Sequence, residues 1–129
     1  IDELLKHSNN IYMPKIVSEK KLKFNMYNKG ESLKKNKYGI DEVLNKNYID
    51  PEMLNIMFIP FVGIDKNGFR LGYGGGFFDR TLEKLKSKKN RPLFVGLGYD
   101  YQILDKHFGE NHDIKYDLVI TESRVLSYN

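Results

Sequence analysis

The sequence DKNGFRLGYGGGFFDR occupies residues 65–80 and joins two segments of opposite character. A strongly apolar run, residues 56–64, precedes it, and a charged amphipathic run, residues 81–89, follows it. Between them, four glycines fall within residues 72–76. Glycine accepts positive φ and lets the backbone approach a ligand, and the start of a helix offers unpaired N–H groups. The order strand, glycine-rich turn, helix therefore predicts a backbone cradle for phosphate.

The apolar run before the glycines predicts a strand. Residues 56–64 are nearly all apolar, which is typical of a strand buried on both faces of a parallel sheet. Pro60 and Gly63 predict an interruption, because proline removes a ladder hydrogen bond and glycine weakens a strand. The Asn67-Gly68 pair that follows predicts a turn in which these residues supply the positive φ angles.

After the glycines, helical and apolar segments alternate. Residues 77–89 carry apolar side chains at spacings of four and three residues, so they predict an amphipathic helix. Residues 93–97 and 117–121 are short apolar runs that predict buried strands, and residues 101–108 predict a short helix. Buried strands that alternate with helices indicate an α/β fold with a mainly parallel sheet.

The N-terminal half of the chain is less regular. Residues 1–7 predict the end of a helix, because their apolar side chains follow helical spacing. Residues 11–17 contain Pro14 and predict either an edge strand or a strand that ends near this proline. Residues 22–27 alternate apolar and polar side chains and predict a half-buried strand. Residues 28–50 are polar and predict a surface excursion with one short helical turn.

Composition limits the classes of protein that the chain can represent. Its 129 residues are 40% hydrophobic, enough to bury a core, and we expect one domain over residues 1–129. No apolar run is long enough for a transmembrane helix, so no membrane partner is expected. The absence of cysteine excludes disulfides, thiol catalysis and Cys-ligated zinc. A cytoplasmic location is the expectation that follows.

The net charge of +4 has two interpretations. An anionic partner such as a nucleotide would favour it, but scattered surface lysines explain most of it. No aromatic ladder is interleaved with the lysines, which argues against a nucleic-acid module. We therefore expect no nucleic-acid partner.

The glycine pattern differs from the common phosphate-binding motifs. A dinucleotide fingerprint that starts at Gly72 requires a glycine at position 77, which is Phe77. One that starts at Gly74 requires a glycine at position 79, which is Asp79. No Gly-Lys-Ser/Thr sequence follows, so a Walker A loop is excluded as well. A generic glycine turn remains the alternative. The guanidinium group of Arg70 before the glycines, and the carboxylate of Asp79 and guanidinium group of Arg80 after them, favour a ligand site.

The stretch RLGYGGGFFDR resembles the central motif of the 5-formyltetrahydrofolate cyclo-ligase family, also called methenyltetrahydrofolate synthetase. The signature of that family is a strand ending in Pro, then Asp and Gly, then Arg-Leu-Gly-x-Gly-x-Gly-Tyr-Tyr-Asp. The positions of this chain that match it are Pro60, Asp65, Gly68, Arg70, Leu71, Gly72, Gly74, Gly76 and Asp79.

The similarity extends over the whole chain on both sides of this motif. It includes Tyr12-Met13-Pro14 as a strand ending in proline, and residues 97–102 as an apolar strand followed by Tyr and Gln. It also includes Tyr38-Gly39-Ile40 with Glu42, and His112-Asp113 with residues 117–122. The resemblance implies a three-layer α/β/α domain with a mainly parallel sheet, similar to cyclo-ligase and NagB, RpiA and CoA transferase-like folds.

The activity implied by the resemblance is an ATP-dependent ring closure in one-carbon metabolism. The formyl oxygen of 5-formyltetrahydrofolate takes the γ-phosphate of ATP, N10 attacks the activated carbon, and phosphate leaves. The products are 5,10-methenyltetrahydrofolate, ADP and phosphate. The implied partners are the small molecules ATP and reduced folate, with Mg²⁺ as the metal, and we expect a monomer.

The resemblance also assigns site residues. Arg70 would act in catalysis by neutralising phosphate oxygens, and Asp79 and Asp113 would ligate Mg²⁺. The alternative for Asp79 is a carboxylate that complements the helix dipole, and for Asp113 a plain loop acid. The ATP loop, whose members Tyr73 to Phe77 would also border the folate, comprises Arg70, Leu71, Gly72, Tyr73, Gly74, Gly75, Gly76, Phe77 and Phe78.

Two departures from the family leave other functions open. Phe77 and Phe78 stand where the family has tyrosines, so a hydroxyl contact is lost, and we expect one of the two rings to pack in the core. The N-terminal portion of the family has no counterpart, so we expect that the chain lacks it. The alternatives are a non-catalytic nucleotide- or folate-binding relative and a structural fragment whose loop binds nothing.

Overall fold

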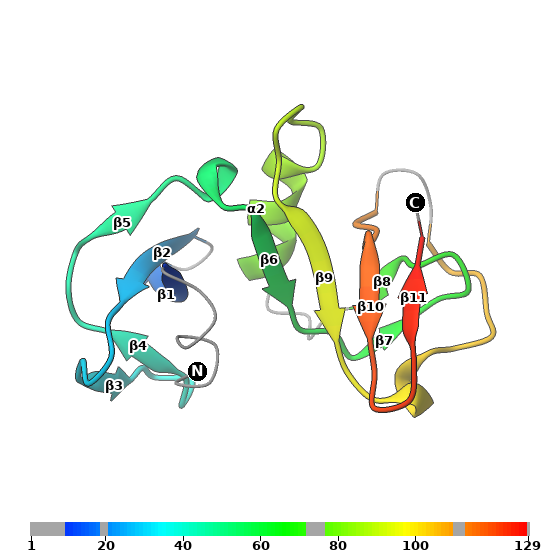
Figure 1. Cartoon of the computed structure of the whole chain (residues 1–129), viewed down its shortest axis with the longest axis horizontal. Coiled ribbons are helices and arrows are strands. Elements are labelled where there is room, and N and C mark those ends of the chain that lie inside the picture. The colour runs from blue at the N-terminus through cyan, green and yellow to red at the C-terminus, as the bar shows by residue number, and fades with distance from the viewer. Residues whose placement is uncertain (1–9, 19–20, 72–76, 110–112, 129) are drawn as a thin grey trace. The chain divides into compact units, whose positions relative to one another are not determined.

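The chain forms two compact units, Ile1–Pro51 and Glu52–Asn129, each of which is described by itself. The helix expected at residues 1–7 lies outside the described residues, and the single domain expected over the whole chain stays a prediction. The computed structural model describes residues 10–18, 21–71, 77–109 and 113–128 (Figure 1).

The first unit contains a three-stranded antiparallel sheet. Its strands β1 (Ile11–Ser18), β2 (Lys21–Tyr27) and β5 (Tyr48–Ile49) lie in the order β1-β2-β5. Pro14 lies within β1, opposite Phe24 of β2. The prediction of an edge strand is therefore confirmed, and the strand continues past the proline, because an edge strand can omit one hydrogen bond on its open side.

Strand β2 buries side chains on both faces. Leu22 and Phe24 are buried, as the alternating pattern predicted. Asn25, which that pattern placed on the exposed face, is completely buried, so this part of the prediction is wrong. Its amide nitrogen donates to the carbonyl oxygen of Asn45, and the Asn45 amide donates to the Met26 carbonyl at 3.1 Å. Backbone partners of this kind allow a polar side chain to be buried.

The helical turn expected within residues 28–50 is wrong. The segment instead contains a hairpin of β3 (Leu33–Lys35) and β4 (Asp41–Val43). Asn36 organises the turn, because its Oδ1 accepts two backbone N–H groups. The Glu42 carboxylate then accepts the Ile16 N–H at 2.7 Å and the Asn36 amide at 3.0 Å, which ties the hairpin to β1.

The second unit contains a four-stranded mixed sheet in the order β11-β10-β9-β6 (Figure 1). Strands β6 (Ile56–Ile59), β9 (Leu93–Leu97) and β10 (Leu118–Ile120) run parallel, and β11 (Val125–Ser127) pairs antiparallel with β10. The predicted α/β class with a mainly parallel sheet is confirmed. Strand β11 was not predicted, because three residues carry too little periodicity. A short 3-10 helix, η1 (Pro51–Met53), precedes β6 in the sequence.

Strand β6 is buried on one face only. Met57 and Ile59 are buried, whereas Ile56 and Phe58 are 50% and 46% exposed. Burial on both faces was therefore the wrong expectation for this strand. Figure 1 shows the helix α2 (Phe77–Leu85) behind β6, so within the described residues the helix covers a single face.

A small hairpin leads from β6 toward the glycines. The interruption predicted at Pro60 and Gly63 is confirmed, since β6 ends before the proline and β7 (Gly63–Ile64) begins at the glycine. Strand β7 pairs antiparallel with β8 (Arg70–Leu71). Gly68 in the turn between them has a φ of 90°, but no non-glycine residue of the described chain has positive φ, so Asn67 does not share this conformation.

The helix after the glycines is shorter than predicted. Residues 77–89 were expected to be helical, whereas α2 ends at Leu85. Leu82 and Leu85 are buried, which confirms the apolar stripe. The four residues beyond Leu85 are polar and bury nothing that would hold another turn of helix. In the part of the chain that the structure describes, no helix is long and apolar enough to span a membrane.

The short helix expected over residues 101–108 is wrong in extent. Only a single 3-10 turn, η2 (Asp100–Gln102), is present. Ile103 then forms a parallel bridge with Ile64, and the Leu104 N–H donates to the Ile64 carbonyl at 2.8 Å. Tertiary pairing with β7 replaces the local helical hydrogen bonds.

Candidate functional site

Arg70 joins the carboxyl end of β6 to the start of α2. Its Nε donates to the Pro60 carbonyl at 3.0 Å, and its Nη1 donates to Oδ1 of Asp79 in the first turn of α2. The Arg70 side chain is only 2% exposed, whereas that of Asp79 is 49% exposed. The structure therefore brings together two charged residues that the resemblance assigned to the site, and leaves the carboxylate accessible.

Asp113 belongs to a segment that runs beside Arg70. The Arg70 N–H donates to the carbonyl of Ile114 at 2.9 Å, and the residues next to them form an antiparallel bridge. Asp113 directly precedes Ile114 in the sequence. Arg70 thus contacts Asp79 through its side chain and the segment that follows Asp113 through its backbone, although the two acids are 34 positions apart in the sequence.

The other residues assigned to the ATP loop are described only in part. Leu71 lies in β8 with 45% of its surface exposed. Phe77 and Phe78 form the first turn of α2, and their side chains lie outside the described part of the structure, so their division between core and ligand stays a prediction. The expected loop residues that also lie outside it are Gly72, Tyr73, Gly74, Gly75 and Gly76.

A buried carboxylate shapes the turn before Arg70. Asp65 is completely buried, and its Oδ1 accepts the N–H groups of Asn67 and Phe69, both at 2.9 Å. Its Oδ2 accepts those of Phe108 and Gly109 at 3.2 and 2.8 Å. Burial raises the pKa of this carboxyl, but the four backbone hydrogen bonds outweigh burial and hold the pKa below its usual value. This role of Asp65 was not predicted, although an aspartate that opens an Asn-Gly turn is a known signal for side-chain capping.

A glutamine fixes the turn that follows β9. The Gln102 Oε1 accepts the Tyr99 N–H at 2.7 Å, and its Nε2 donates to the carbonyls of Phe61 and Val62, both at 3.1 Å. A Cβ on Gly98 would collide with Phe61 and lie 2.8 Å from the Gln102 Oε1. The turn is therefore packed against the chain that leaves β6. No role of Gln102 was predicted, although it lies just past an apolar strand, where α/β proteins place functional side chains.

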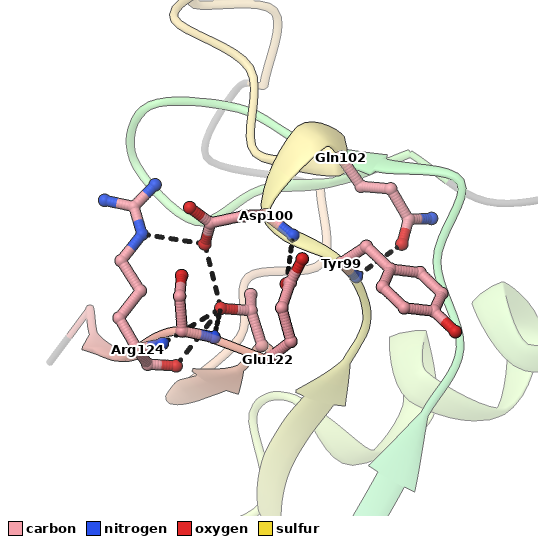
Figure 2. Close-up of polar contacts among 7 residues, drawn as sticks. Tyr99, Asp100, Gln102, Glu122 and Arg124 are labelled. Atoms are coloured by element: carbon pink, nitrogen blue, oxygen red, sulfur yellow. Dashed lines mark hydrogen bonds and ion pairs between the residues drawn. The ribbon is translucent and has the colours of Figure 1, made fainter.

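On its other side the same turn is tied to the end of β10. Asp100 Oδ1 accepts the Thr121 hydroxyl at 2.8 Å and the Arg124 Nε at 2.9 Å. The Asp100 N–H donates to Glu122 at 2.7 Å, and Figure 2 shows these residues across the turn from Gln102. The hydrogen bonds from Arg124 and Thr121 lower the pKa of Asp100. The carboxyl ends of β9 and β10 are thereby held together.

A second ion pair lies at the opposite, amino ends of the parallel strands. Arg91 donates through Nη1 and Nη2 to the two oxygens of Asp117 at 2.7 and 2.9 Å, and the Phe94 N–H donates to the same carboxylate at 2.7 Å. The hydrogen bonds that Arg91 donates to the Asp117 carboxylate raise the pKa of Arg91. Because these residues lie at the amino ends of β9 and β10, the pair supports the sheet rather than the candidate site.

The donor set limits which metal the site can hold. Among the described residues, no three His, Cys, Asp or Glu side chains are grouped as metal ligands. The accessible carboxylate of Asp79 fits Mg²⁺, because this ion is commonly bound through one or two carboxylates and substrate phosphates while it keeps several waters. The side chains do not fit a metal enclosed entirely by protein.

These features define a class: an α/β protein with a glycine-rich sequence between a strand of its parallel sheet and a helix, and an Arg–Asp pair at the helix start. The chain belongs to the 5-formyltetrahydrofolate cyclo-ligase family, whose sequence profile matches residues 1–122. The resemblance noted from the RLGYGGGFFDR motif is therefore confirmed.

Curated relatives carry the same family name. The 5-formyltetrahydrofolate cyclo-ligase of Haemophilus influenzae is 36% identical over 125 residues, which cover 93% of this chain and 66% of the relative. That of Escherichia coli K12 is 33% identical over 129 residues, which cover 97% of this chain and 70% of the relative. The chain thus spans about two thirds of the length of these relatives.

Solved structures show the same fold. The 5,10-methenyltetrahydrofolate synthetase of Aquifex aeolicus superposes with a TM-score of 0.80 at 28% identity, over 98% of this chain and 62% of that protein. The synthetase of Mycoplasma pneumoniae superposes with a TM-score of 0.68 at 24% identity, over 95% of this chain and 62% of that protein. At this identity the second likeness concerns the fold alone.

Proposed function

We propose that the chain carries out the ATP-dependent cyclisation of 5-formyltetrahydrofolate to 5,10-methenyltetrahydrofolate, with release of ADP and phosphate. The observation that carries the proposal is the contact between Arg70 and Asp79 at the start of α2, in a chain of the cyclo-ligase family. Because the chain spans about two thirds of its curated relatives, the complete activity is part of the proposal.

Phosphoryl transfer of this kind depends on positioning and on charge neutralisation more than on a protein nucleophile. The formyl oxygen attacks the γ-phosphorus, and the bond from that phosphorus to the bridging oxygen of ADP breaks. N10 then attacks the activated carbon and gives up its proton, which balances the charge of the phosphate, and phosphate leaves with the former formyl oxygen. The nine-residue helix α2 would direct its N-terminal N–H groups at phosphate oxygens.

The contacts of Arg70 favour a positioning role for this residue. Its guanidinium is nearly buried, and Nε and Nη1 are engaged by Pro60 and Asp79. Asp79 is the more exposed partner and is held in one orientation by the arginine. Mg²⁺, when bound, would supply positive charge to the phosphates, and Asp79 and Asp113 would hold it. Arg70 would then act on phosphate chiefly by holding the Asp79 carboxylate in position.

A binding assay with the full chain tests the proposal. Titration calorimetry with ATP and Mg²⁺ should show that Arg70→Ala and Asp79→Asn each weaken ATP binding about tenfold to a hundredfold, the loss of one charge-assisted contact. Asp105→Asn is the control, because the Asp105 side chain is 94% exposed and should leave the affinity unchanged. Unchanged affinity in both site variants would refute the site. Turnover is measured separately as the absorbance of methenyltetrahydrofolate.

One observation favours a second function, nucleotide or folate binding without turnover. Phe77 and Phe78 replace the tyrosines of the family motif. Ligand binding without methenyl product would select this alternative. In either case we propose small-molecule partners, a monomer and a cytoplasmic location, and light scattering after size-exclusion chromatography would check the oligomeric state.

A further inference from the structure

Two exposed tyrosines stand directly after β9. The rings of Tyr99 and Tyr101 are stacked, with their centroids 5.8 Å apart and their planes 10° from parallel. Tyr99 is 59% exposed and Tyr101 79% exposed. Much of this aromatic surface therefore faces water. A planar ligand that covered it would bind more tightly, because removing aromatic surface from water is favourable.

The backbone beneath the tyrosine pair is held in place. The Tyr99 N–H donates to the Gln102 side-chain oxygen (Figure 2). The Gln102 amide nitrogen in turn donates to the carbonyls of Phe61 and Val62. The close approach of Gly98 to the Phe61 ring leaves no room for a side chain there. A platform that is fixed before binding loses little conformational entropy when a ligand arrives.

The same segment connects the tyrosines to the candidate site. Val62, whose carbonyl binds Gln102, donates its N–H to the Leu71 carbonyl at 2.8 Å, and Leu71 is the neighbour of Arg70. Val62 and Leu71 are 43% and 45% exposed. Two exposed apolar side chains, Val62 and Leu71, thus lie on the segments between the tyrosine turn and Arg70. Val62 follows the carboxyl end of β6, and ligands bind beyond the carboxyl ends of the strands in open α/β proteins.

We infer that Tyr99 and Tyr101 form a stacking platform for a planar aromatic ring of a bound substrate. The inference rests on the proposed function, because both of its substrates carry such a ring. These are the adenine of ATP and the aminobenzoyl ring of the reduced folate. Stacking on an aromatic side chain accepts either ring, since each presents a π-face.

Separate titrations with the two ligands test the platform and identify the ring. In the full chain, Tyr99→Ala and Tyr101→Ala should each weaken one ligand about tenfold, which is the usual loss of one stacking contact. A loss for ATP with Mg²⁺ assigns the adenine, and a loss for 5-formyltetrahydrofolate assigns the aminobenzoyl ring. Tyr99→Phe should retain the affinity, because the ring survives. Tyr38→Ala, which removes another exposed tyrosine, should change neither affinity.

The outcomes separate this inference from the proposed function. If the unaltered chain binds a ligand and neither alanine variant weakens it, the platform is refuted while the proposed function stands. If the unaltered chain binds neither ligand, both the platform and the proposed function are refuted. Thermal unfolding of each variant shows whether it is folded, and Tyr101→Ala, at the more exposed position, decides the matter if Tyr99→Ala does not fold.

Discussion

The Asp65→Asn substitution would turn one buried carboxylate oxygen into an NH₂ group while keeping the shape of the side chain. Asp65 accepts four backbone N–H groups, two at each oxygen, and none of its surface is exposed. Whichever way the amide is oriented, two backbone donors would face an NH₂ group. The asparagine therefore cannot satisfy the site that the aspartate fills.

The size of the effect follows from these contacts. An unsatisfied buried donor costs about 1–3 kcal/mol, so two of them cost about 2–6 kcal/mol. The favourable orientation keeps Oδ1 on Asn67 and Phe69 and turns NH₂ toward Phe108 and Gly109. Because Phe108 is 40% exposed, water can reach that pair and reduce the penalty. We expect a loss of about 3 kcal/mol in the free energy of unfolding.

Urea unfolding followed by circular dichroism measures this loss. Asp65→Asn should shift the midpoint strongly at an unchanged slope, whereas the control Asp105→Asn, at an exposed site, should change the free energy of unfolding by less than about 0.5 kcal/mol. Equal midpoints for the two variants would refute the reasoning, because the carboxylate would then be replaceable by a neutral group of the same shape.

The pH dependence gives an independent check of the sign. The folded pKa of Asp65 lies below its usual 3.8, so the carboxylate contributes stability above that value. The contribution is lost as the pH falls through the folded pKa. The difference in unfolding free energy between the unaltered chain and Asp65→Asn should stay constant between about pH 7 and pH 5 and shrink below about pH 4. A difference that did not depend on pH would contradict this account.

Two further substitutions test the packing at the carboxyl ends and the amino ends of the parallel strands. Gly98→Ala should lower the free energy of unfolding by about 1–3 kcal/mol, because the new Cβ would collide with the Phe61 ring. Thermal unfolding measures this loss, and an unchanged Tm would show that the Phe61 ring moves aside without cost. Asp117→Asn should cost about 2–4 kcal/mol, since it leaves Arg91 without its charged partner. Urea unfolding measures that cost, and adding Arg91→Leu should restore part of the stability if the cost comes from the unpaired arginine.

Local patterns in the sequence were sufficient for several elements. The apolar run with Pro60 and Gly63 predicted a strand with an interruption, and the structure has it. The spacing of Leu82 and Leu85 predicted the buried stripe of α2. These predictions hold because chain stiffness and side-chain periodicity act over a few residues. The predicted extents of α2 and of the helix after Gln102 were wrong. The residues beyond Leu85 have no buried apolar side chain to hold another turn, and pairing with β7 replaces the helix after Gln102.

The roles of single polar residues were not predictable in the same way. The alternation of apolar and polar residues predicted that Asn25 is exposed, whereas in the structure it is buried and bonded to the segment of Asn45. Asp65 and Gln102 matched family positions, but each also binds a distant partner: Gly109 lies 44 positions from Asp65, and Phe61 lies 41 positions from Gln102. A carboxylate or an amide carries no local signal for such partners, because its hydrogen bonds depend on which chain segment arrives beside it.

The sequence by itself determined the strand before the glycines, the helix after them and, through the RLGYGGGFFDR motif, the family. It also named Arg70, Asp79 and Asp113 as site residues. Only the tertiary structure decided that Arg70 is buried against Asp79 and that its backbone pairs with the strand next to Asp113. The reason is physical: glycine content and apolar periodicity act along the chain, whereas an ion pair and a strand register exist only after distant segments pack together.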